Sequence, residues 1–579
     1  MKRFLVLLFA LLFAVLAMTA CGDSTDPAVA ETTAPPETEV PLSDMEIIKD
    51  GTANYTIIRP EKTDDATIDA ATKLMNKLRQ YTGVTLRLST DWIKPGDEYN
   101  ADTLEILVGR TGYSESIEAL KGIVYGDYIV TRIGNKLVVN AWTAEGLERA
   151  ITKLGNLAKD GASDGNLTLP ADTHITGTII SGLNELPTYT DGSFNTVVTL
   201  NNKNYLMLFE DTSADAFAAY LNAVEQNGYT LYAENEINKN KFVTYTNDKY
   251  IFNLGYYSFN SQARLIVEPK SAMPPREEDN TYTAVTEPKF AMLGLAYPVN
   301  GEVMGNGQCL IWQLSDGSFI IHDGGAHRDR DAKQIYEFLY ENAPDKKNIV
   351  ISAWIISHSH GDHDGAFYNF SRNYAHLVKL KYFISNLPLE GMSTDTATSM
   401  QRTLNAVRDF SGAKLIQAHV GQVYHFADAR IEILYTLDSF VPGSLNYFNT
   451  TSLSLHLDLG GQRFLVLGDT SNEAAGVLYS TCGDYLKSDF VQIAHHGGPT
   501  GPTETSSFKN LTNVYTASAA PVALWPAIAR AINSYGTLPR NTTWMNLPST
   551  KEIFMAGDRQ VVFTLPYTYG TSGLESILK

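Results

Sequence analysis

The sequence has 579 residues, of which 44% are hydrophobic and 19% are charged, and its formal net charge is −19. This length predicts several domains of about 150 residues each, with enough apolar residues for sizeable cores. The acidic balance argues against nucleic acid as a partner, because phosphate contacts require lysine and arginine. Three cysteines are too few for a disulfide framework.

A secretory signal is predicted at residues 1–20. Two basic residues precede an apolar core that ends in small residues and is too short to span a membrane. The run Met18-Thr19-Ala20-Cys21 resembles a bacterial lipobox, which implies that Cys21 is lipidated and anchors the protein to the extracytoplasmic face of the cell membrane. The alternatives are a simple signal with a chance cysteine and a membrane anchor. Residues 21–45, rich in Thr, Pro, Glu and Ala, are predicted to form a disordered tether.

Residues 46–178 are predicted to form a small α/β domain with two helices on one sheet. Helices are expected at 65–81 and 143–157, where apolar residues recur at helical spacing. Phrases such as Tyr81-Thr82-Gly83 and Ile106-Leu107-Val108-Gly109 resemble the accessory α/β domains that precede some carbohydrate-active enzymes. No catalytic constellation is recognisable in this region.

Residues 179–285 are predicted to form a small α+β domain. A helix is expected at 214–227, and strands are expected at 205–209, 241–245, 250–256 and 264–267. The frequent tyrosines favour half-buried strand positions, and an aromatic binding face for a cell-wall polymer is the alternative.

Three histidines and an aspartate lie within six positions directly after an apolar stretch, 350–356, that is predicted to be a strand. In an extended loop, residues two apart point the same way, so His358 and His360 can bind one metal ion. Asp362 and His363 then face a second ion at the start of the next helix. Imidazole and carboxylate groups are the ligands that zinc and similar divalent ions prefer. The alternative is a polar surface loop.

The pattern His-x-His-x-Asp-His-x-Gly at 358–365 resembles the signature of the metallo-β-lactamase-fold hydrolases. The resemblance implies an αββα sandwich over residues 286–579 and two divalent metal ions, with zinc as the first choice. It further implies that Asp469, at the end of a predicted strand, bridges the two ions. It also implies that Asp323 braces the metal loop through hydrogen bonds. For Asp469 the alternative is a turn aspartate that caps the following helix.

A further apolar strand is predicted to end at the pair His495-His496. By its position before Gly497, His496 is expected to be the last ligand of the second ion and His495 to face the substrate, although the reverse assignment stays open. Many members of the family place another histidine before the strand pair that leads to Gly-Asp. Residues 446–452 contain none, and the other nearby histidines, His419, His425 and His456, do not fit that position cleanly.

The run Asn449-Thr450-Thr451-Ser452-Leu453, taken with Gly468-Asp469 and His495-His496-Gly497, resembles one branch of the family. That branch contains the hydrolase domain of DNA-uptake competence proteins and the teichoic-acid phosphorylcholine esterases. The resemblance implies that fewer protein ligands hold the first ion and that the substrate is a phosphodiester.

The sequence therefore predicts a metal-dependent hydrolase of a small-molecule or cell-wall substrate outside the cytoplasm, with a phosphodiesterase as the first choice. A hydroxide shared by the two ions is expected to attack the substrate, with Asp362 orienting it and His495 as a candidate proton donor. The alternatives are a hydrolase of a lactone or β-lactam, and a glycan-binding surface lipoprotein whose hydrolase fold is inactive.

Overall fold

The structure, a computed structural model, describes residues 43–576 with gaps at 122, 124–125, 180–185, 202–203, 300–301, 388–393, 444, 446, 499–508, 529–531, 534–535, 538, 558, 572 and 575. The predicted signal, Cys21 and nearly all of the predicted tether lie outside the described residues. No helix among the described residues combines the length and the apolar character that crossing a membrane requires.

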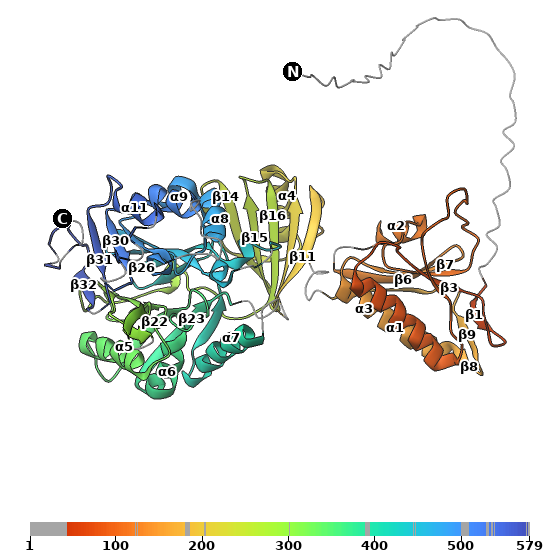
Figure 1. Ribbon diagram of the computed structural model, residues 1–579, viewed down its shortest axis with the longest axis horizontal. Coiled ribbons are helices and arrows are strands. Elements are labelled where there is room, and N and C mark those ends of the chain that lie inside the picture. Colours follow the sequence, from red (N-terminus) through yellow and green to blue (C-terminus); the bar gives the residue numbers. More distant parts are fainter. Residues whose placement is uncertain are drawn as a thin grey trace, which may run out of the picture.

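In its described residues, the first folded region contains two sheets and three helices, where one sheet and two helices were predicted (Figure 1). The strands are β1 (Met45–Lys49), β2 (Thr52–Ala53), β3 (Thr56–Arg59), β4 (Leu88–Thr90), β5 (Glu105–Val108), β6 (Asp127–Ile133), β7 (Lys136–Ala141), β8 (Ala162–Ser163), β9 (Asn166–Leu169) and β10 (His174–Thr178). They form a six-stranded sheet in the order β10-β6-β7-β5-β3-β4 and a four-stranded sheet in the order β2-β1-β9-β8.

Helices α1 (Asp65–Thr82) and α3 (Ala144–Gly161) are the two predicted ones, and each begins at a capping side chain. Asp64 caps α1 by accepting a hydrogen bond from the backbone N–H of Thr67. The prediction missed α2 (Ser114–Lys121) because its pattern is not apolar on the buried side. Ala119 is its single buried apolar residue, whereas Ile117 is 55% exposed.

The second region is one antiparallel sheet with one helix, and we call it the middle sheet. Its members are β11 (Ser193–Asn201), β12 (Asn204–Glu210), α4 (Ala214–Gln226), β13 (Thr230–Ile237), β14 (Asn240–Thr246), β15 (Tyr250–Tyr257) and β16 (Gln262–Pro269). The six strands lie in the order β11-β12-β16-β15-β14-β13. The sequence pattern missed β11 and β13, which are rich in polar residues and form the two edges of the sheet.

Helix α4 covers one face of the middle sheet. Phe217, Tyr220 and Val224 on the helix pack in one apolar cluster with strand residues that include Tyr245 and Tyr256. Both of these strand tyrosines are buried, where half-buried positions were predicted, so neither contributes to an exposed aromatic face.

The third region is built on two seven-stranded sheets that face each other. The first has the order β24-β23-β22-β21-β20-β17-β32, and the second has the order β25-β26-β27-β28-β29-β30-β31. The strands of the first are β17 (Lys289–Met292), β20 (Leu310–Gln313), β21 (Phe319–His322), β22 (Ile349–Ile355), β23 (Val378–Ser385), β24 (Lys414–Gln417) and β32 (Val561–Thr564). Those of the second are β25 (Val423–Phe426), β26 (Ala429–Tyr435), β27 (Ser454–Leu459), β28 (Gln462–Val466), β29 (Phe490–Gln492), β30 (Val522–Trp525) and β31 (Glu552–Met555).

Helices cover the outer faces of both sheets of the third region (Figure 1). On the first sheet lie α5 (Asp329–Asn342), α6 (Gly365–Tyr374) and α7 (Thr394–Ala406), and on the second lie α8 (Asn472–Cys482), α9 (Lys509–Ser518) and α11 (Pro539–Met545). The apolar core between the sheets contains residues such as Trp312, Ile355, Leu455 and Phe464, all at most 1% exposed. The layers therefore run helix, sheet, sheet, helix, and the mixed α/β class of the prediction is confirmed.

The strand order brings the three segments that carry the predicted metal ligands to one end of the sandwich. The loop 356–364 follows β22, Asp469 follows β28, and His495 and His496 follow β29. Strand β28 pairs in parallel with β29, and β21 pairs in parallel with β22. Because the carboxyl ends of parallel neighbours meet at one edge, loops from both sheets converge at one end of the sandwich.

Candidate metal centre

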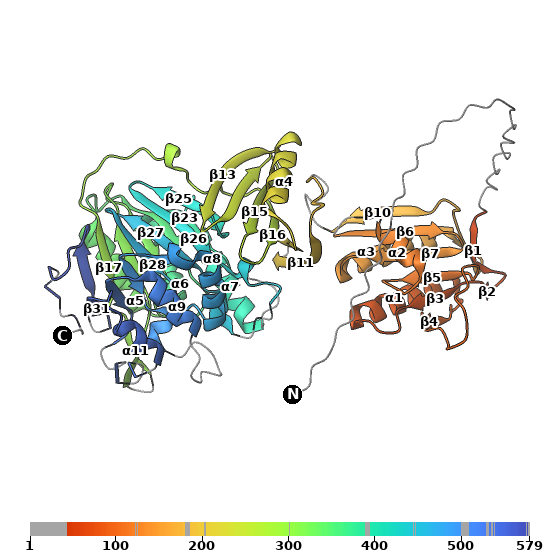
Figure 2. The same cartoon turned by 90° about the horizontal axis from the view of Figure 1, so that it is seen from above.

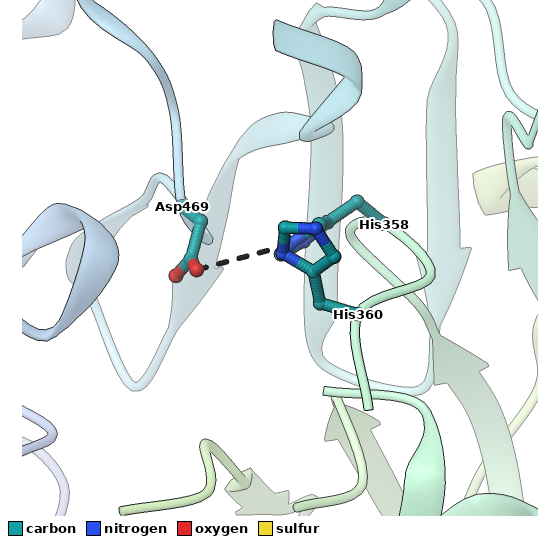
Figure 3. Close-up of side chains that lie close together, drawn as sticks. All are labelled: His358, His360 and Asp469. Atoms are coloured by element: carbon teal, nitrogen blue, oxygen red, sulfur yellow. Dashed lines mark ion pairs between the residues drawn. The ribbon is translucent and has the colours of Figure 1, made fainter. Parts of the chain in front are cut away.

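The loop after β22 and the turn after β28 form a first cluster of possible metal ligands. His358, His360 and Asp469 each offer a ligand atom, and these atoms all lie within 4.8 Å of one another. The distance from Nε2 of His358 to Oδ2 of Asp469 is 3.7 Å. Figure 3 shows both imidazoles directed toward the carboxylate from the opposite side of the site.

A second cluster of the same size consists of Asp362, His363 and His496, again with ligand atoms within 4.8 Å of one another. Nε2 of His496 lies 3.5 Å from Oδ2 of Asp362. Nε2 of His363 lies 4.0 Å from Oδ1 of the same carboxylate. All six residues that the sequence singled out as metal ligands are thus brought together in two groups of three.

Asp469 lies between the clusters. Its Oδ1 is 3.0 Å from Nε2 of His363 and 3.8 Å from Nε2 of His496. Its Oδ2 is 3.7 Å from Nε2 of His358 and 3.8 Å from Nε2 of His495. One oxygen therefore faces each cluster, which is the arrangement of a carboxylate that bridges two ions.

The chain reaches this position through Gly468, whose φ is 57°. A Cβ atom built on Gly468 would lie 2.7 Å from the Cβ of Ser357, so the close approach of the two segments requires glycine. The backbone N–H of Asp469 donates to Oγ of Ser452, 3.2 Å away. Burial and these contacts fix the carboxylate, which is 1% exposed.

The histidine rings present the nitrogen that a metal would need. Nδ1 of His363 contacts Oδ2 of Asp323 at 2.7 Å, and Nδ1 of His496 contacts the carbonyl oxygen of Pro526 at 2.7 Å. Because a carbonyl or carboxylate oxygen accepts, the proton lies on Nδ1 and Nε2 keeps its lone pair. Nε2 of His358, His363 and His496 is buried and has no hydrogen-bond partner among the described residues. Buried polar atoms without partners are costly, so the donor set fits a pair of divalent ions.

Asp323 braces this arrangement. It follows β21 with a φ of 60°, and its Oδ1 accepts from the backbone N–H of Ser357 at 2.8 Å. Its Oδ2 accepts from Oγ of Ser357 at 3.0 Å, from Nε2 of Gln308 at 3.0 Å and from Nδ1 of His363. A carboxylate that orients a ligand imidazole in this way fixes both its tautomer and its direction.

When no ion is bound, burial and neighbouring charges shift the pKa values of the side chains in the site. Burial, together with the neighbouring His363, holds the pKa of His358 well below its usual value, so this imidazole is neutral. Burial opposes ionisation of Asp469, but His363, His495 and His496 hold the pKa of its carboxyl well below the usual value. Burial likewise opposes protonation of His363, yet Asp469 and Asp323 raise its pKa well above the usual value. The two carboxylates thus attract positive charge to this point.

The backbone has an unusual conformation at the two adjacent histidines after β29. His495 has φ 51° and His496 has φ 52°, both in the left-handed region that non-glycine residues rarely adopt. The ring of His496 joins the second cluster. His495 lies on the Oδ2 side of Asp469, its side chain is 24% exposed, and its ring centroid is 6.4 Å from that of Tyr447.

Near the first cluster, residues 447–449 contribute aromatic rings and an amide and no histidine. The ring centroid of Phe448 lies 4.9 Å from that of His360 and 6.0 Å from that of His358. Asn449 is fully buried, and its Oδ1 has no hydrogen-bond partner among the described residues. His419 and His456 are both engaged elsewhere, beside Asp438 and Glu432 respectively.

Sequence reasoning missed one polar group near the clusters, Tyr297 on the hairpin of β18 (Ala296–Val299) and β19 (Glu302–Asn306). Its ring packs over Gly305, and the guanidinium of Arg328 lies 4.8 Å from the ring centroid. Burial and the charge of Asp362 raise the pKa of Tyr297 to about 12, so its hydroxyl stays protonated. No local sequence pattern marks this hairpin, because only the fold brings it to the loop that carries Asp362.

Comparisons with known proteins give similarities to solved structures alone. No protein-family model matches the chain, and neither does any curated protein. The metallo-β-lactamase-fold protein YhfI from Bacillus subtilis is 12% identical and has a TM-score of 0.30, with 48% of this chain and 99% of that chain covered. CmlA, a diiron β-hydroxylase from Streptomyces venezuelae, is 13% identical with a TM-score of 0.29, covering 52% of this chain and 55% of that chain.

A metal-dependent hydrolase from Parabacteroides distasonis is 13% identical with a TM-score of 0.24, and the similarity covers 46% of this chain and 98% of that one. All three TM-scores lie below 0.5. The function of this chain is therefore inferred from its own sequence and ligand geometry.

Proposed function

We propose that this chain is a metal-dependent hydrolase of the metallo-β-lactamase fold that cleaves a phosphodiester outside the cytoplasm. One observation carries the proposal: one oxygen of Asp469 faces the imidazoles of the first cluster, and the other faces the second cluster of Asp362, His363 and His496. His358 and His360 would hold one ion, Asp362, His363 and His496 the other, and Asp469 both. Ions held in this way supply Lewis acidity, which activates water and stabilises negative charge on the substrate.

The chain's own residues have distinct tasks in this reaction. Asp362 is half-buried at the edge of the second cluster, where its carboxylate can orient the attacking water. Phe448 covers His360 and limits the access of bulk water from that side. Hydrolysis forms a bond between the water oxygen and phosphorus and breaks the bond to the leaving alcohol oxygen, which takes up a proton.

His495 is the candidate donor to a substrate oxygen. Burial lowers the pKa of its imidazole, so the ring is neutral and carries a single N–H. Its Nε2 lies 3.8 Å from Oδ2 of Asp469, and the side chain is 24% exposed. A substrate oxygen within hydrogen-bond distance of this ring would therefore find a donor.

The phosphodiester class rests on the resemblance of 449–453, 468–469 and 495–497 to the competence and phosphorylcholine-esterase branch. The test is a screen of the mature chain, loaded with zinc, on bis-p-nitrophenyl phosphate, p-nitrophenyl phosphorylcholine, a chromogenic lactam and plasmid DNA. The proposal expects turnover of at least one phosphodiester reporter and none of the lactam. Turnover of the lactam alone would overturn the phosphodiester class.

A matched pair of variants separates a metal ligand from an ordinary histidine. His360→Ala removes a ligand of the first cluster, whereas His376→Ala alters an exposed histidine at the end of α6. Since loss of groups that merely orient a ligand costs about 10–100-fold, loss of a ligand should cost more than about 100-fold. His376→Ala should retain full activity. Equal activity of both variants, with no bound metal, would instead favour a binding protein with an inactive hydrolase fold.

The proposed location depends on Cys21, which lies outside the described residues. Lipidation at Cys21 would place the hydrolase on the extracytoplasmic face of the membrane, where a wall-bound or diffusible substrate reaches it. Labelling cells with a clickable fatty acid tests this proposal, with Cys21→Ser as the control. Incorporation into the wild type and not the variant supports it, and equal labelling or no labelling contradicts it.

A further inference from the structure

The face of the middle sheet that α4 leaves uncovered carries buried polar and charged side chains besides its apolar ones. Four of these side chains are between 5% and 7% exposed: Asn204 on β12, Asn253 on β15, and Arg264 and Glu268 on β16. Buried polar and charged side chains are stable only when they have partners. Their partners include residues of the third region, and Figures 1 and 2 both show the middle sheet beside that region.

Arg264 makes the most directional of these contacts. Its Nη1 donates to the carbonyl oxygen of Asp438 at 2.5 Å and to that of Val441 at 2.7 Å. The phenol of Tyr257, on the neighbouring strand, lies 3.1 Å from Oγ of Ser439. The middle sheet therefore holds the backbone of the turn 437–441 from outside the sandwich.

The side chain of Asp438 links the turn to the third region and, through His419, to the middle sheet. Its Oδ2 accepts from Nδ1 of His419 at 2.6 Å and from Nδ2 of Asn386 at 2.9 Å. The other ring nitrogen of His419 lies 3.5 Å from Oε1 of Glu268 on β16. Burial opposes the charged imidazole, but the carboxylates of Asp438 and Glu268 raise the pKa of His419 to about 10. A charged histidine between two carboxylates thus joins the regions at the turn.

The chain runs from this turn to the metal clusters. Seven residues beyond Val441, the ring centroid of Phe448 lies 4.9 Å from that of His360. Four residues later, Oγ of Ser452 accepts from the backbone N–H of Asp469. The described part of 437–452 is therefore held by the middle sheet at the turn 437–441 and by the backbone of Asp469 at Ser452.

We propose that Arg264 is a positioning residue for the metal centre: by holding the turn 437–441 it sets where Phe448 lies against His358 and His360. The middle sheet is then part of the active-site scaffold and not a separable binding module. Arg264 touches neither the clusters nor a substrate, so its effect passes through the segment. Only the kinetic part of the test rests on the proposed function.

The variant Arg264→Met removes both hydrogen bonds to the turn, and Arg264→Lys keeps the charge with a single donor group. Lys241→Met is the matched control, because Lys241 lies in the same sheet and pairs with Glu234 at its exposed edge. The first readout is limited chymotrypsin cleavage of the mature chain at Phe440, Tyr447 or Phe448. Cleavage in the segment should be about tenfold faster in Arg264→Met, intermediate in Arg264→Lys and unchanged in Lys241→Met.

The second readout is kinetic, on bis-p-nitrophenyl phosphate. Because the ligands are untouched, bound zinc should stay at the wild-type amount and kcat should change less than about threefold. KM should rise about tenfold, since a displaced wall residue weakens substrate positioning. The double variant Arg264→Met with Phe448→Ala should be no worse than Phe448→Ala alone, because both act through one ring.

Two results overturn the inference: unchanged cleavage and KM in a folded Arg264→Met protein, or equal changes in Lys241→Met. If Arg264→Met does not fold, Glu268→Gln weakens the link to His419 while keeping an acceptor for Asn253, and cleavage of the segment should rise about threefold. No increase in that variant contradicts the inference. Cleavage needs no substrate, so a chain inactive on phosphodiesters still tests the role of Arg264 separately.

Discussion

His363 and Asp469 come within 3.0 Å of each other through Nε2 and Oδ1, and yet neither atom has a properly directed hydrogen bond among the described residues. Two buried, oppositely charged groups this close would ordinarily turn toward each other. Instead both point at a common space that His496 and Asp362 also face. This geometry is that of ligands around an ion.

Replacing the bridging carboxylate should weaken both sites. Asp469→Asn keeps the shape of the side chain and removes the charge that faces the two clusters, so zinc affinity should fall by more than about 100-fold. Competition with a chromogenic chelator measures it. Asp458→Asn, which alters a half-exposed partner of Arg463 on β27, should leave zinc affinity unchanged. Equal affinities in all three proteins would rule out a bridging role.

Replacement of Asp323, which orients His363 and Ser357, should lower zinc affinity measurably but less than replacement of a metal ligand does. Asp323→Asn loses the charged acceptor for His363 Nδ1 and Ser357, so zinc affinity is expected to fall about 10–100-fold. Isothermal titration of the apo protein measures the change. The amide should also allow His363 to take the wrong tautomer. The loss of zinc affinity should therefore be larger at the second cluster, which contains His363, than at the first. An unchanged titration would contradict the role of Asp323.

Removal of metal should destabilise the third region specifically. An ion that binds only the folded state at 100 times its Kd adds about 2.7 kcal/mol to the free energy of unfolding. Chelation should therefore lower the melting temperature of this region, with the first folded region, which carries none of these ligands, unaffected. Differential scanning calorimetry with and without chelator resolves the two. A uniform shift, or no shift, would argue against metal-linked folding.

The His419 link predicts a pH dependence of stability. Its folded-state pKa of about 10 lies above the usual 6.5, so its contribution is complete below about pH 6.5 and is lost as the pH rises through 10. The carboxylates of Asp438 and Glu268 are the charged groups in contact with its ring. The stability advantage of the wild type over His419→Gln in urea should therefore be larger at pH 6 than at pH 10. An advantage that is constant or grows with pH would show that His419 is not charged in the folded protein.

Local patterns predicted much of the site. His358, His360, Asp362 and His363 fall in one loop after an apolar strand, so their convergence depends on short-range geometry that the sequence displays. The local pattern alone does not identify Asp469 as a metal ligand, because a Gly-Asp at a strand end is also a common helix cap. The family resemblance supplied that knowledge, and the structure places the carboxylate between the clusters.

Interactions between regions were outside the reach of sequence patterns. Arg264 reads as an ordinary polar strand residue, and its partners are backbone carbonyls 174 and 177 residues away in the sequence. The polar edge strands β11 and β13 and the short helix α2 also escaped prediction, because tertiary packing and not periodicity fixes their conformation. Tyr297 was missed for the same reason, since only the fold places its hairpin beside Asp362.

The metal content of the purified mature chain tests the two-ion site most directly, measured by inductively coupled plasma mass spectrometry after dialysis against excess zinc and then metal-free buffer. We expect two zinc ions per wild-type chain, and one or fewer in Asp469→Asn. Wild-type protein that retains no zinc, or Asp469→Asn protein that retains two, would rule out a two-ion site bridged by Asp469.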